Sequence, residues 1–414
     1  MGGIQEALRK RDLRLLLGAG LISRTGDWTL RIGLAYRVYV ITGSTVASAL
    51  MLLASFIPQV TLGSVAGVFV DRWDRKRTMI VSNLLLAGGL LPLLVVKDVG
   101  QVWVVYLVLA LEGCVQQLFT PAEQALLPHL VEDDHLVTAN ALNAQSQSLA
   151  RLLGGALGGV AAASGGIVAL TLVDLSSFLL AAGLLARIHR GLREIVEATP
   201  ARGRLAEILF QWMDGVHVAW REPVLRTILI FLLVTSVGEG IMGTLFAPFV
   251  RTTLHGSGEA YGLIVAMQAA GGIVGGLAAA WLGSRISASQ LLGWGSVAFG
   301  AIDLVMFLYP LAWVAIWPAV VCMVVVGLPG ALVISGAMTL MQRHTADSHR
   351  GRLFGALSAV EGVSVVAGTV AAGLLGGSVG IVPVLVTQGA GYVLAGIFVL
   401  VALRGAVSLS GQRQ

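Results

Sequence analysis

The loop Gly67–Arg77 constrains the fold more than any other stretch of this chain, because it concentrates charge between two long apolar segments. Six of the seven residues 71–77 are charged. Such a cluster cannot lie in hydrocarbon, so the apolar segments on its two sides are expected to cross a membrane and to be joined by this loop. The loop therefore marks one water interface of a membrane protein.

The composition indicates the same class of protein. Hydrophobic residues make up 56% of the 414 residues and charged residues only 12%, and the mean hydropathy is +0.86. These values lie outside the range of soluble globular domains. The 53 glycines suit many packed membrane helices, because small residues let such helices approach closely.

The net charge of +5 does not indicate a nucleic-acid partner, because the basic residues sort by side of the membrane. With twelve spans and a cytoplasmic N-terminus, 21 of the 27 Lys and Arg residues fall on cytoplasmic segments, three on the outer face and three inside spans. This bias follows the positive-inside rule. It supports the span count and places both termini in the cytoplasm.

We therefore predict an all-α membrane protein with twelve transmembrane helices. Each span can cross roughly 30 Å of hydrocarbon. The spans are expected near residues 14–40, 45–70, 78–96, 101–121, 138–162, 166–186, 223–249, 258–282, 290–309, 312–341, 352–376 and 381–403. The predicted domains are an N-terminal six-helix bundle (1–186), a polar cytoplasmic linker (187–222) and a C-terminal six-helix bundle (223–414).

The two halves look like copies of each other. Gly26-Asp27 in span 1 corresponds to Gly238-Glu239 in span 7 at an offset of 212 residues, and Cys114 corresponds to Cys322 at an offset of 208. Shared offsets near half the chain length indicate parallel repeats around a pseudo-twofold axis along the membrane normal, with a substrate path between the halves.

Four motifs resemble one transporter superfamily. The loop Gly67–Arg77 resembles motif A of the major facilitator superfamily (MFS), with Asp74 where a glycine is usual. Gly26–Trp28, Pro121–Pro128 and Ala139–Asn143 resemble the macrolide-efflux branch of bacterial drug:proton antiporters. The resemblance implies the MFS fold of two pseudo-symmetric six-helix bundles, alternating access, a bacterial inner (cytoplasmic) membrane location and a monomer.

The motif A residues are expected to act as a conformational latch. The superfamily fold places the Asp71 end of span 2 beside the start of span 11, whose unpaired N–H groups favour an anion. Asp71 would then hold the cytoplasmic side closed, while other residues tether neighbouring loops or only set topology. The latch residues are Gly67, Asp71, Arg72, Arg75 and Lys76.

Span 5 carries a glycine motif formed by Gly154, Gly155, Gly158 and Gly159. It resembles the antiporter motif Gly-Pro-x-x-Gly-Gly, but Gly155 stands where proline is expected. Two interpretations stay open: a small-residue face for close helix contact, and an antiport-specific role where the halves rock against each other.

Six acidic residues lie inside predicted spans, where a charge is costly unless it is paired, hydrated or functional. They are Asp27, Glu112, Asp174, Glu239, Asp303 and Glu361. Asp27 is the first candidate proton carrier and Glu239, its symmetry mate, the second. Glu112 and Glu361 rank next, and the remaining two acids are expected near the membrane edge or beside polar neighbours. The alternative for Asp27 is a fixed ion pair with Arg31.

Span 1 holds the densest set of buried charges. Arg24, Asp27 and Arg31 are spaced three and four residues apart, so they share one helical face with a net positive charge. This face is expected to recruit Glu112 from span 4. Arg151, one turn before the glycine motif, would either partner an acid or contact an anionic substrate group.

Other kinds of chemistry have little support in the sequence. There is no phosphate-binding Gly-x-x-x-x-Gly-Lys-Ser/Thr motif, no metal-like spacing of His and Cys residues and no legible catalytic triad. We therefore expect no enzyme activity, no metal and no cofactor, with a proton gradient as the energy source.

The expected function is proton-coupled efflux of hydrophobic or amphipathic small molecules such as macrolides and other drugs. Spans with few charges suit such compounds better than sugars, which need many polar groups. The expected partners are the small-molecule substrate, membrane lipids and protons. Three alternatives stay open: an exporter of a siderophore, lipid or natural product, a membrane enzyme acting on lipids, and a non-transporting membrane sensor.

Overall fold

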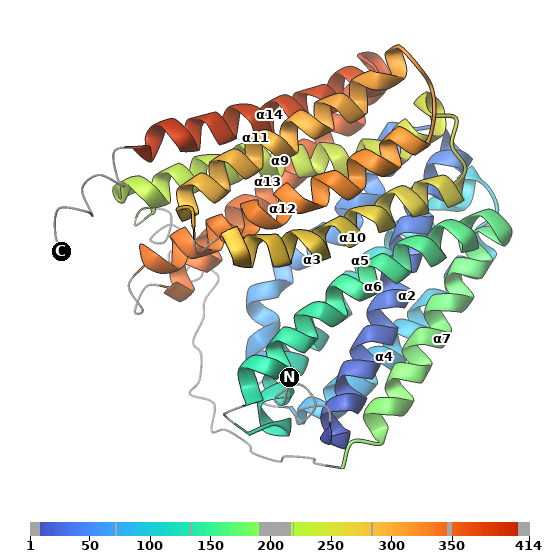
Figure 1. The fold of residues 1–414 in the computed structure, drawn as a ribbon. Coiled ribbons are helices and arrows are strands. Elements are labelled where there is room, and N and C mark those ends of the chain that lie inside the picture. Colours follow the sequence, from blue (N-terminus) through green and yellow to red (C-terminus); the bar gives the residue numbers. More distant parts are fainter. Residues whose placement is uncertain are drawn as a thin grey trace. The chain divides into compact units, whose positions relative to one another are not determined.

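The computed structural model describes residues 9–70, 73–132, 135–189, 217, 219–282, 285–345 and 350–404. Nearly all of these residues are helical, and this part of the chain contains no β-strand (Figure 1).

Twelve long helices run through the described ranges. In the first half they are α2 (Arg11–Thr42), α3 (Thr45–Val70), α4 (Arg75–Leu90), α5 (Val102–Leu126), α6 (Leu136–Ser164) and α7 (Gly166–Ala186). In the second half they are α9 (Pro223–Pro248), α10 (Gly258–Leu282), α11 (Ala288–Leu308), α12 (Trp317–Arg343), α13 (Arg350–Ser378) and α14 (Ile381–Ala402). Each coincides with one predicted span, so the predicted all-α membrane fold is confirmed.

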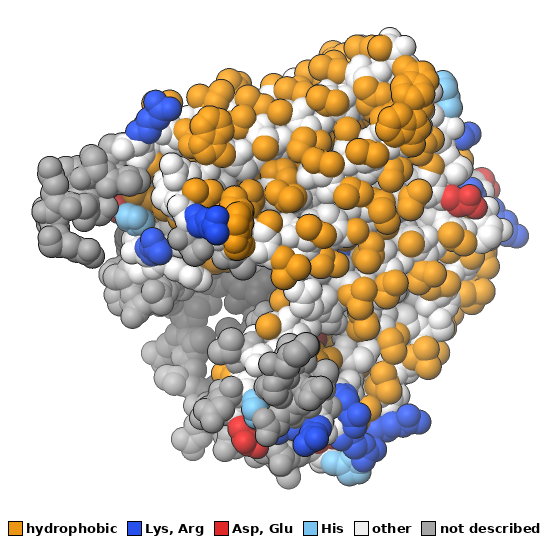
Figure 2. Space-filling model, in the orientation of Figure 1, with side chains coloured by type: hydrophobic (Ala, Val, Ile, Leu, Met, Phe, Trp, Pro, Cys, Tyr) orange, Lys and Arg blue, Asp and Glu red, His pale blue; other side chains and the backbone are white. Residues whose placement is uncertain are grey.

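The helices present apolar side chains to their surroundings. Nine segments of the described chain are long and apolar enough to cross a membrane, and α3 adds the shorter apolar stretch Thr45–Gln59. Helices α2 and α6 fall outside that set, because α2 carries internal charges and α6 many polar residues. Hydrophobic side chains cover most of the face in Figure 2, and large residues such as Leu180 and Leu311 are 60% and 74% exposed. A surface of this kind is suited to lipid.

The chain divides into two compact units. Unit one comprises Met1–Gly43, Leu50–Arg202 and Ser257–Ala266, and unit two comprises Ser44–Ala49, Gly203–Gly256 and Met267–Gln414. The predicted linker 187–222 falls largely outside the described residues, so the predicted domain limits stay a prediction.

The two units repeat the same helix pairings. In unit one α2 packs against α6 and α7, and α4 packs against α5 and α7. In unit two α9 packs against α13 and α14, and α11 packs against α12 and α14. These pairs correspond, because α9, α11, α12, α13 and α14 hold the places in the second half that α2, α4, α5, α6 and α7 hold in the first. The internal repeat seen in the sequence is therefore also a repeat of packing.

Equivalent glycines make two of these contacts possible. A Cβ atom at Gly26 of α2 would lie 2.7 Å from the Ser177 Cβ of α7, and a Cβ atom at Gly238 of α9 would lie 2.9 Å from the Gln388 Cγ of α14. Both distances are too short for real side chains. Glycine at these two positions thus lets the first helix of each unit pack closely against the last.

Two helix ends differ from the prediction. Span 4 was expected to end at Pro121, but α5 continues through this proline to Leu126, since neighbouring groups in a membrane bundle can satisfy the freed backbone carbonyl. Span 10 was expected to begin at residue 312, but α12 begins at Trp317. Pro318 occupies its first turn, where proline is favoured because its N–H would be unpaired anyway.

Asp74, which replaces the usual motif A glycine, has a structural role. Its Oδ1 atom accepts a hydrogen bond of 2.7 Å from the backbone N–H of Arg77, and it is the N-cap of α4. The carboxylate accepts a hydrogen bond from a backbone N–H that would otherwise be unbonded, and its negative charge complements the positive end of the helix dipole. Asp71 and Arg72 lie outside the described residues, so the latch role assigned to them stays a prediction.

We expect Asp74→Ala to lower the free energy of unfolding by about 1 kcal/mol, and Asp74→Gly to lower it by only a few tenths of a kcal/mol. Alanine removes the cap without offering the backbone freedom that glycine gives. Unfolding of the purified protein in detergent would compare the two variants. Equal losses for both variants would show that the side chain does not cap the helix.

Candidate functional site

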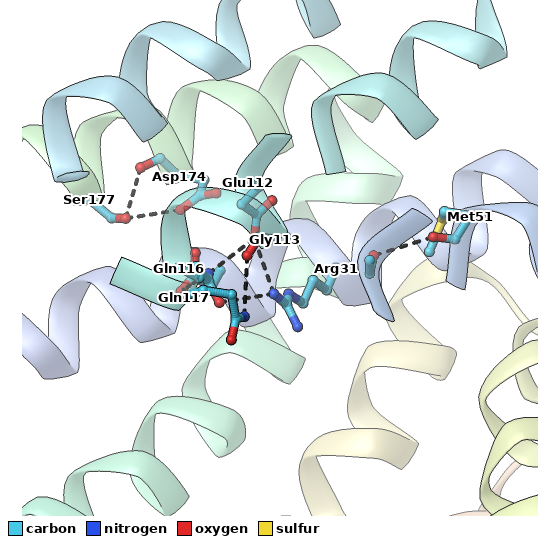
Figure 3. Close-up of polar contacts among 10 residues, drawn as sticks. Arg31, Met51, Glu112, Gly113, Gln116, Gln117, Asp174 and Ser177 are labelled. Atoms are coloured by element: carbon cyan, nitrogen blue, oxygen red, sulfur yellow. Dashed lines mark hydrogen bonds and ion pairs between the residues drawn. The ribbon is translucent and has the colours of Figure 1, made fainter. Parts of the chain in front are cut away.

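A set of polar side chains bridges α2 and α5 inside unit one. Arg31 Nη2 donates hydrogen bonds to Glu112 Oε1 at 3.3 Å and to Gln116 Oε1 at 3.2 Å. Gln116 Nε2 in turn donates to Asp27 Oδ2 at 3.1 Å and to Glu112 Oε1 at 3.2 Å. In Figure 3 the Arg31 side chain reaches towards Glu112 and Gln116. The two bonds from Gln116 Nε2 join Asp27 and Glu112 in one hydrogen-bond network.

A second ion pair lies about two turns away along α2 and about three turns away along α5. Arg24 Nη2 pairs with Glu123 Oε2, and Arg24 Nη1 donates to Asn143 Oδ1 of α6 at 3.3 Å. The Glu123 side chain is 3% exposed and that of Arg24 17%. Charge-assisted pairs of this kind are strong where water is largely excluded. We call the resulting set the polar ladder: Arg24, Asp27 and Arg31 of α2 with Glu112, Gln116 and Glu123 of α5.

Asp174 of α7 lies beside the polar ladder. It is completely buried, and its Oδ1 accepts a hydrogen bond of 3.1 Å from Ser177 Oγ. Its carboxylate interacts electrostatically with Asp27, Glu112 and Arg31. Figure 3 shows Asp174 and Ser177 on the helix next to Glu112. The close approach of α7 at Gly26 brings this fourth carboxylate into the cluster.

The polar ladder and Asp174 contain more acids than bases. Four carboxylates, Asp27, Glu112, Glu123 and Asp174, face two guanidinium groups. Several of their oxygens are buried without a hydrogen-bond partner, namely Asp27 Oδ1, Glu112 Oε2, Glu123 Oε1 and Asp174 Oδ2. Excess negative charge in a buried site is unfavourable unless protons or a cation neutralise it.

The charged face of span 1 was expected to recruit Glu112, and the structure shows this with Arg31 as the partner, but the alternative of a direct ion pair between Asp27 and Arg31 is wrong for the described residues. Gln116 stands between the two side chains. The sequence also missed Glu123, because span 4 was ended at Pro121. Nothing in the sequence marked Gln116 as a functional residue, since an uncharged polar residue in a span is typical of ordinary helix packing.

A cavity opens beside the polar ladder within unit one. Its empty volume is about 380 Å³, including its open mouth. The wall contains the Arg24–Glu123 end and the middle of the ladder, and its side chains come from α2, α4, α5 and α7: Ser23, Arg24, Asp27, Asn83, Leu86, Gln116, Phe119, Thr120, Glu123 and Phe178. The half-buried Asp27 and the buried Glu123 thus share one polar space.

The remaining sequence candidates of the first half have defined contacts. The Arg151 guanidinium lies 5.2 Å from the centre of the Trp28 ring, in cation–π geometry. Arg75 Nη1 donates to the Ala125 carbonyl at 3.1 Å, and Lys76 Nζ donates to the Ala186 and Ile188 carbonyls. Arg75 and Lys76 therefore tie the start of α4 to the ends of α5 and α7, whereas Gly67 lies within α3.

Unit two holds acids but no matching arginines. Tyr392 donates a hydrogen bond to Glu239 Oε1 at 2.5 Å, and Gln388 Nε2 donates to Asp303 Oδ2 at 2.8 Å. Glu361 interacts electrostatically with Glu239. Within the described ranges no Lys or Arg forms an ion pair with these three acids. Neutral donors therefore hold Glu239 and Asp303 in unit two, whereas guanidinium groups hold Glu112 and Glu123 in unit one.

The span 5 glycines make two close helix contacts. A Cβ atom at Gly158 would lie 2.7 Å from the Thr29 carbonyl oxygen of α2, and Gly154 meets the same stretch of α2. A Cβ atom at Gly159 would lie 2.9 Å from Gly262 Cα, and Gly155 also faces the segment Ser257–Ala266, which belongs to the same unit. The four glycines thus give α6 two faces without side chains.

A sequence model described as "transmembrane secretion effector" matches residues 5–409, almost the whole chain. The chain belongs to this MFS family. Its fold agrees with that assignment. It superposes with a TM-score of 0.75 on a bacterial homologue of the iron transporter ferroportin, with 16% identity over 95% of this chain and 99% of the other. It superposes with a TM-score of 0.78 on the nucleoside transporter NupG, with 10% identity over 95% and 100%.

Relatives within the family connect the chain to transport. The MFS-type transporter YfiS of Bacillus subtilis, itself uncharacterised, is 25% identical over 96% of this chain and 95% of its own length. The multidrug efflux pump Tap of Mycolicibacterium fortuitum is 25% identical over 90% and 91%. Macrolide efflux protein A of Streptococcus pyogenes is 32% identical, but over only 27% and 28%. The protein is thus a multi-pass membrane transporter of the MFS.

The contribution of the Arg31–Glu112 ion pair to the stability of this transporter can be tested directly. We expect Arg31→Met to lower the free energy of unfolding by about 3 kcal/mol, because it leaves a buried carboxylate without its cation. The double variant Arg31→Met/Glu112→Leu should recover most of that loss, since it removes both charges. Unfolding in detergent measures both, and a double variant as unstable as the single one would contradict the pairing.

The span 5 contacts predict the effect of a single methyl group. We expect Gly158→Ala to lower the free energy of unfolding by about 1–3 kcal/mol, because the added Cβ meets the backbone of α2. Gly183→Ala in α7 is the matched control, since nothing lies within 4 Å of the added atom. Replacing glycine in an open helix position should leave stability unchanged or slightly raised. Equal effects at both positions would argue against close packing at Gly158.

Proposed function

We propose that this transporter exports hydrophobic or amphipathic small molecules, such as macrolides and other drugs, in exchange for protons by alternating access. The polar ladder is the observation that carries the proposal. Together with Asp174, it places four carboxylates against two guanidinium groups in the interior of unit one. The names of two relatives, a multidrug efflux pump and a macrolide efflux protein, support the substrate class.

Proton coupling needs a carboxylate that gains and loses a proton as its surroundings change. Asp27 meets the structural requirement, because its Oδ2 is held by Gln116 while its Oδ1 has no partner. Arg24 and Arg31 act on it electrostatically from one turn to either side, and Glu112 acts from α5. A shift of either arginine towards or away from Asp27 would change how readily it holds a proton.

The acids of unit two are the second set of candidates. Glu239 and Glu361 are exposed in unit two, and Tyr392 orients the Glu239 carboxylate. An exposed acid without an arginine partner can take up a proton or meet a cationic group of a substrate. Glu239 therefore ranks after Asp27, and Glu112 and Glu361 rank below both.

The contacts of Arg75 and Lys76 support a mechanical role for the charged loop. Both side chains bind backbone carbonyls at the ends of neighbouring helices, where positive charge also complements the helix dipole. In the proposed cycle these contacts keep the helix ends of unit one together while Asp71 acts as the latch. We further propose that the transporter works as a monomer in a bacterial inner membrane, with both termini in the cytoplasm and no cofactor.

Transport by purified protein in proteoliposomes tests the proposal. An imposed proton gradient should drive movement of ethidium or a radiolabelled macrolide, and an uncoupler should abolish it. We expect Asp27→Asn to lower the initial rate about 100-fold, the lower end of what a positioned proton-transfer group contributes. Glu239→Gln should have a smaller effect.

Expression and unfolding of both variants control for misfolding. Flux that ignores the gradient in the wild type and in both variants would reject proton coupling. Gradient-driven flux that Asp27→Asn leaves intact would keep the antiport but remove Asp27 as its carrier.

A further inference from the structure

The cavity of unit one is lined by hydrogen-bond acceptors that lack donors. Asn83 Oδ1, Glu123 Oε1 and Asp27 Oδ1 all belong to lining residues, and each of these atoms is buried without a hydrogen-bond partner. The Asn83 side chain is fully buried and Glu123 is 3% exposed. Their amide and second carboxylate groups are already fixed, by Met79 and Arg24 respectively. The residues of the cavity wall therefore carry three acceptor oxygens that no donor of the described residues reaches.

The size of the cavity restricts that occupant. Its empty volume of about 380 Å³ includes open solvent at the mouth, and only about 60 Å³ of it can be taken by the centres of water-sized molecules. This space is far below the roughly 300–1,000 Å³ of pockets that bind drug-sized ligands, so a macrolide does not fit within it. Water molecules, each with a share of about 30 Å³ in the liquid, do fit, and they need the two to four polar partners that these walls supply.

The position of the cavity connects it to one end of the bundle. Glu123 lies three residues before the end of α5, and the neighbouring Ala125 carbonyl binds Arg75 of the charged loop. Asp27 lies one turn further along α2 than Arg24, towards the middle of the bundle. The cavity thus joins the loop end of unit one to the proposed proton carrier.

We propose that this cavity is a hydrated proton-access chamber and that Glu123 is a relay carboxylate between the water at the loop end and Asp27. The inference deepens the proposed function and rests on it for the use of protons. Water in the chamber carries a proton from Asp27 Oδ1 to Glu123 Oε1, and Glu123 then releases it to water at the mouth. No bond other than O–H bonds forms or breaks.

Arg24 makes this relay responsive to charge. It pairs with Glu123 and also acts electrostatically on Asp27, one turn away on the same helix. A proton on Glu123 removes the negative charge that holds Arg24, and the guanidinium can then turn towards the ionised Asp27. Loss of that proton restores the original pair, so one arginine serves two carboxylates in turn.

Other charged groups face the two carboxylates from each packed helix. Asp27 meets Arg24 and Arg31 from its own helix, Glu112 from α5 and Asp174 from α7. Glu123 meets Arg24 of α2, and Asn143 of α6 holds the other arm of that arginine. Glu112 is tied to Arg31 and Asp174 to Ser177. Glu123 is therefore the acid with a free oxygen nearest the loop end.

The first arm of the test measures hydration without transport. Ser23→Cys and Ser82→Cys are made in a Cys114→Ala/Cys322→Ala background. Both serines are buried in unit one, at 3% and 2% exposure, but only Ser23 lines the cavity. We expect 2-aminoethyl methanethiosulfonate, a water-soluble thiol reagent, to modify the cysteine at 23 about tenfold faster, the effect of one pKa unit on thiolate fraction. Equal rates would overturn the hydrated chamber.

The second arm measures the relay in proteoliposomes. Glu123→Gln keeps an oxygen that can accept from Arg24 but cannot carry a proton. We expect it to lower gradient-driven efflux of ethidium about 100-fold, while exchange of ethidium across the membrane without a gradient stays at the wild-type rate. Glu123→Asp should restore gradient-driven efflux. Equal loss of both activities, or no loss of either, would overturn the relay.

The two arms separate this inference from the proposed function. If flux through the wild-type protein does not depend on the gradient, proton coupling and the relay are both rejected. The labelling rates at positions 23 and 82 would still show whether the chamber is hydrated. Gradient-driven flux in the wild type that Glu123→Gln leaves unchanged would reject the relay alone.

Discussion

The cost of burying charge away from water governs the interior of this transporter. A charged side chain inside a membrane bundle persists only with a partner, with water or with a function. Arg24 and Arg31 meet that requirement through Glu123 and Glu112, in pairs about two turns apart along α2 and about three along α5. These pairs fix the facing sides of α2 and α5, and they leave Asp27 between two arginines. The candidate carrier is thus positioned both by its own hydrogen bond from Gln116 and by ion pairs of its neighbours.

Close packing of small residues determines which acids meet. Gly26 lets α7 approach α2, and this approach brings Asp174 within electrostatic range of Asp27. Gly158 and Gly154 do the same for α6, whose Asn143 holds one arm of Arg24. In a membrane, helices gain little from hydrophobic association, so such contacts carry much of the packing. The glycines therefore shape the charge cluster although none of them is polar.

The fold was largely predictable from the sequence, because most spans are marked by a long apolar run and the charged loop marks an interface. The approach of Glu112 to the charged face of α2 was also predictable, since helical spacing puts Arg24, Asp27 and Arg31 on one face. Glu123 was not, because proline was read as a helix end and α5 continues through Pro121. Nothing in the sequence indicated Gln116, Gln388 and Tyr392, for another reason. The role of a neutral side chain depends on which acid it bonds, and only the structure gives that contact.

The two units share their packing but not their charge, and this difference limits how the acids can be used. In unit one guanidinium groups hold Glu112 and Glu123, so a change in protonation there must move or release an arginine. In unit two Tyr392 and Gln388 hold Glu239 and Asp303, and neutral donors cannot compensate a full charge. Protonation in unit one is therefore coupled to side-chain rearrangement, whereas in unit two it mainly removes charge.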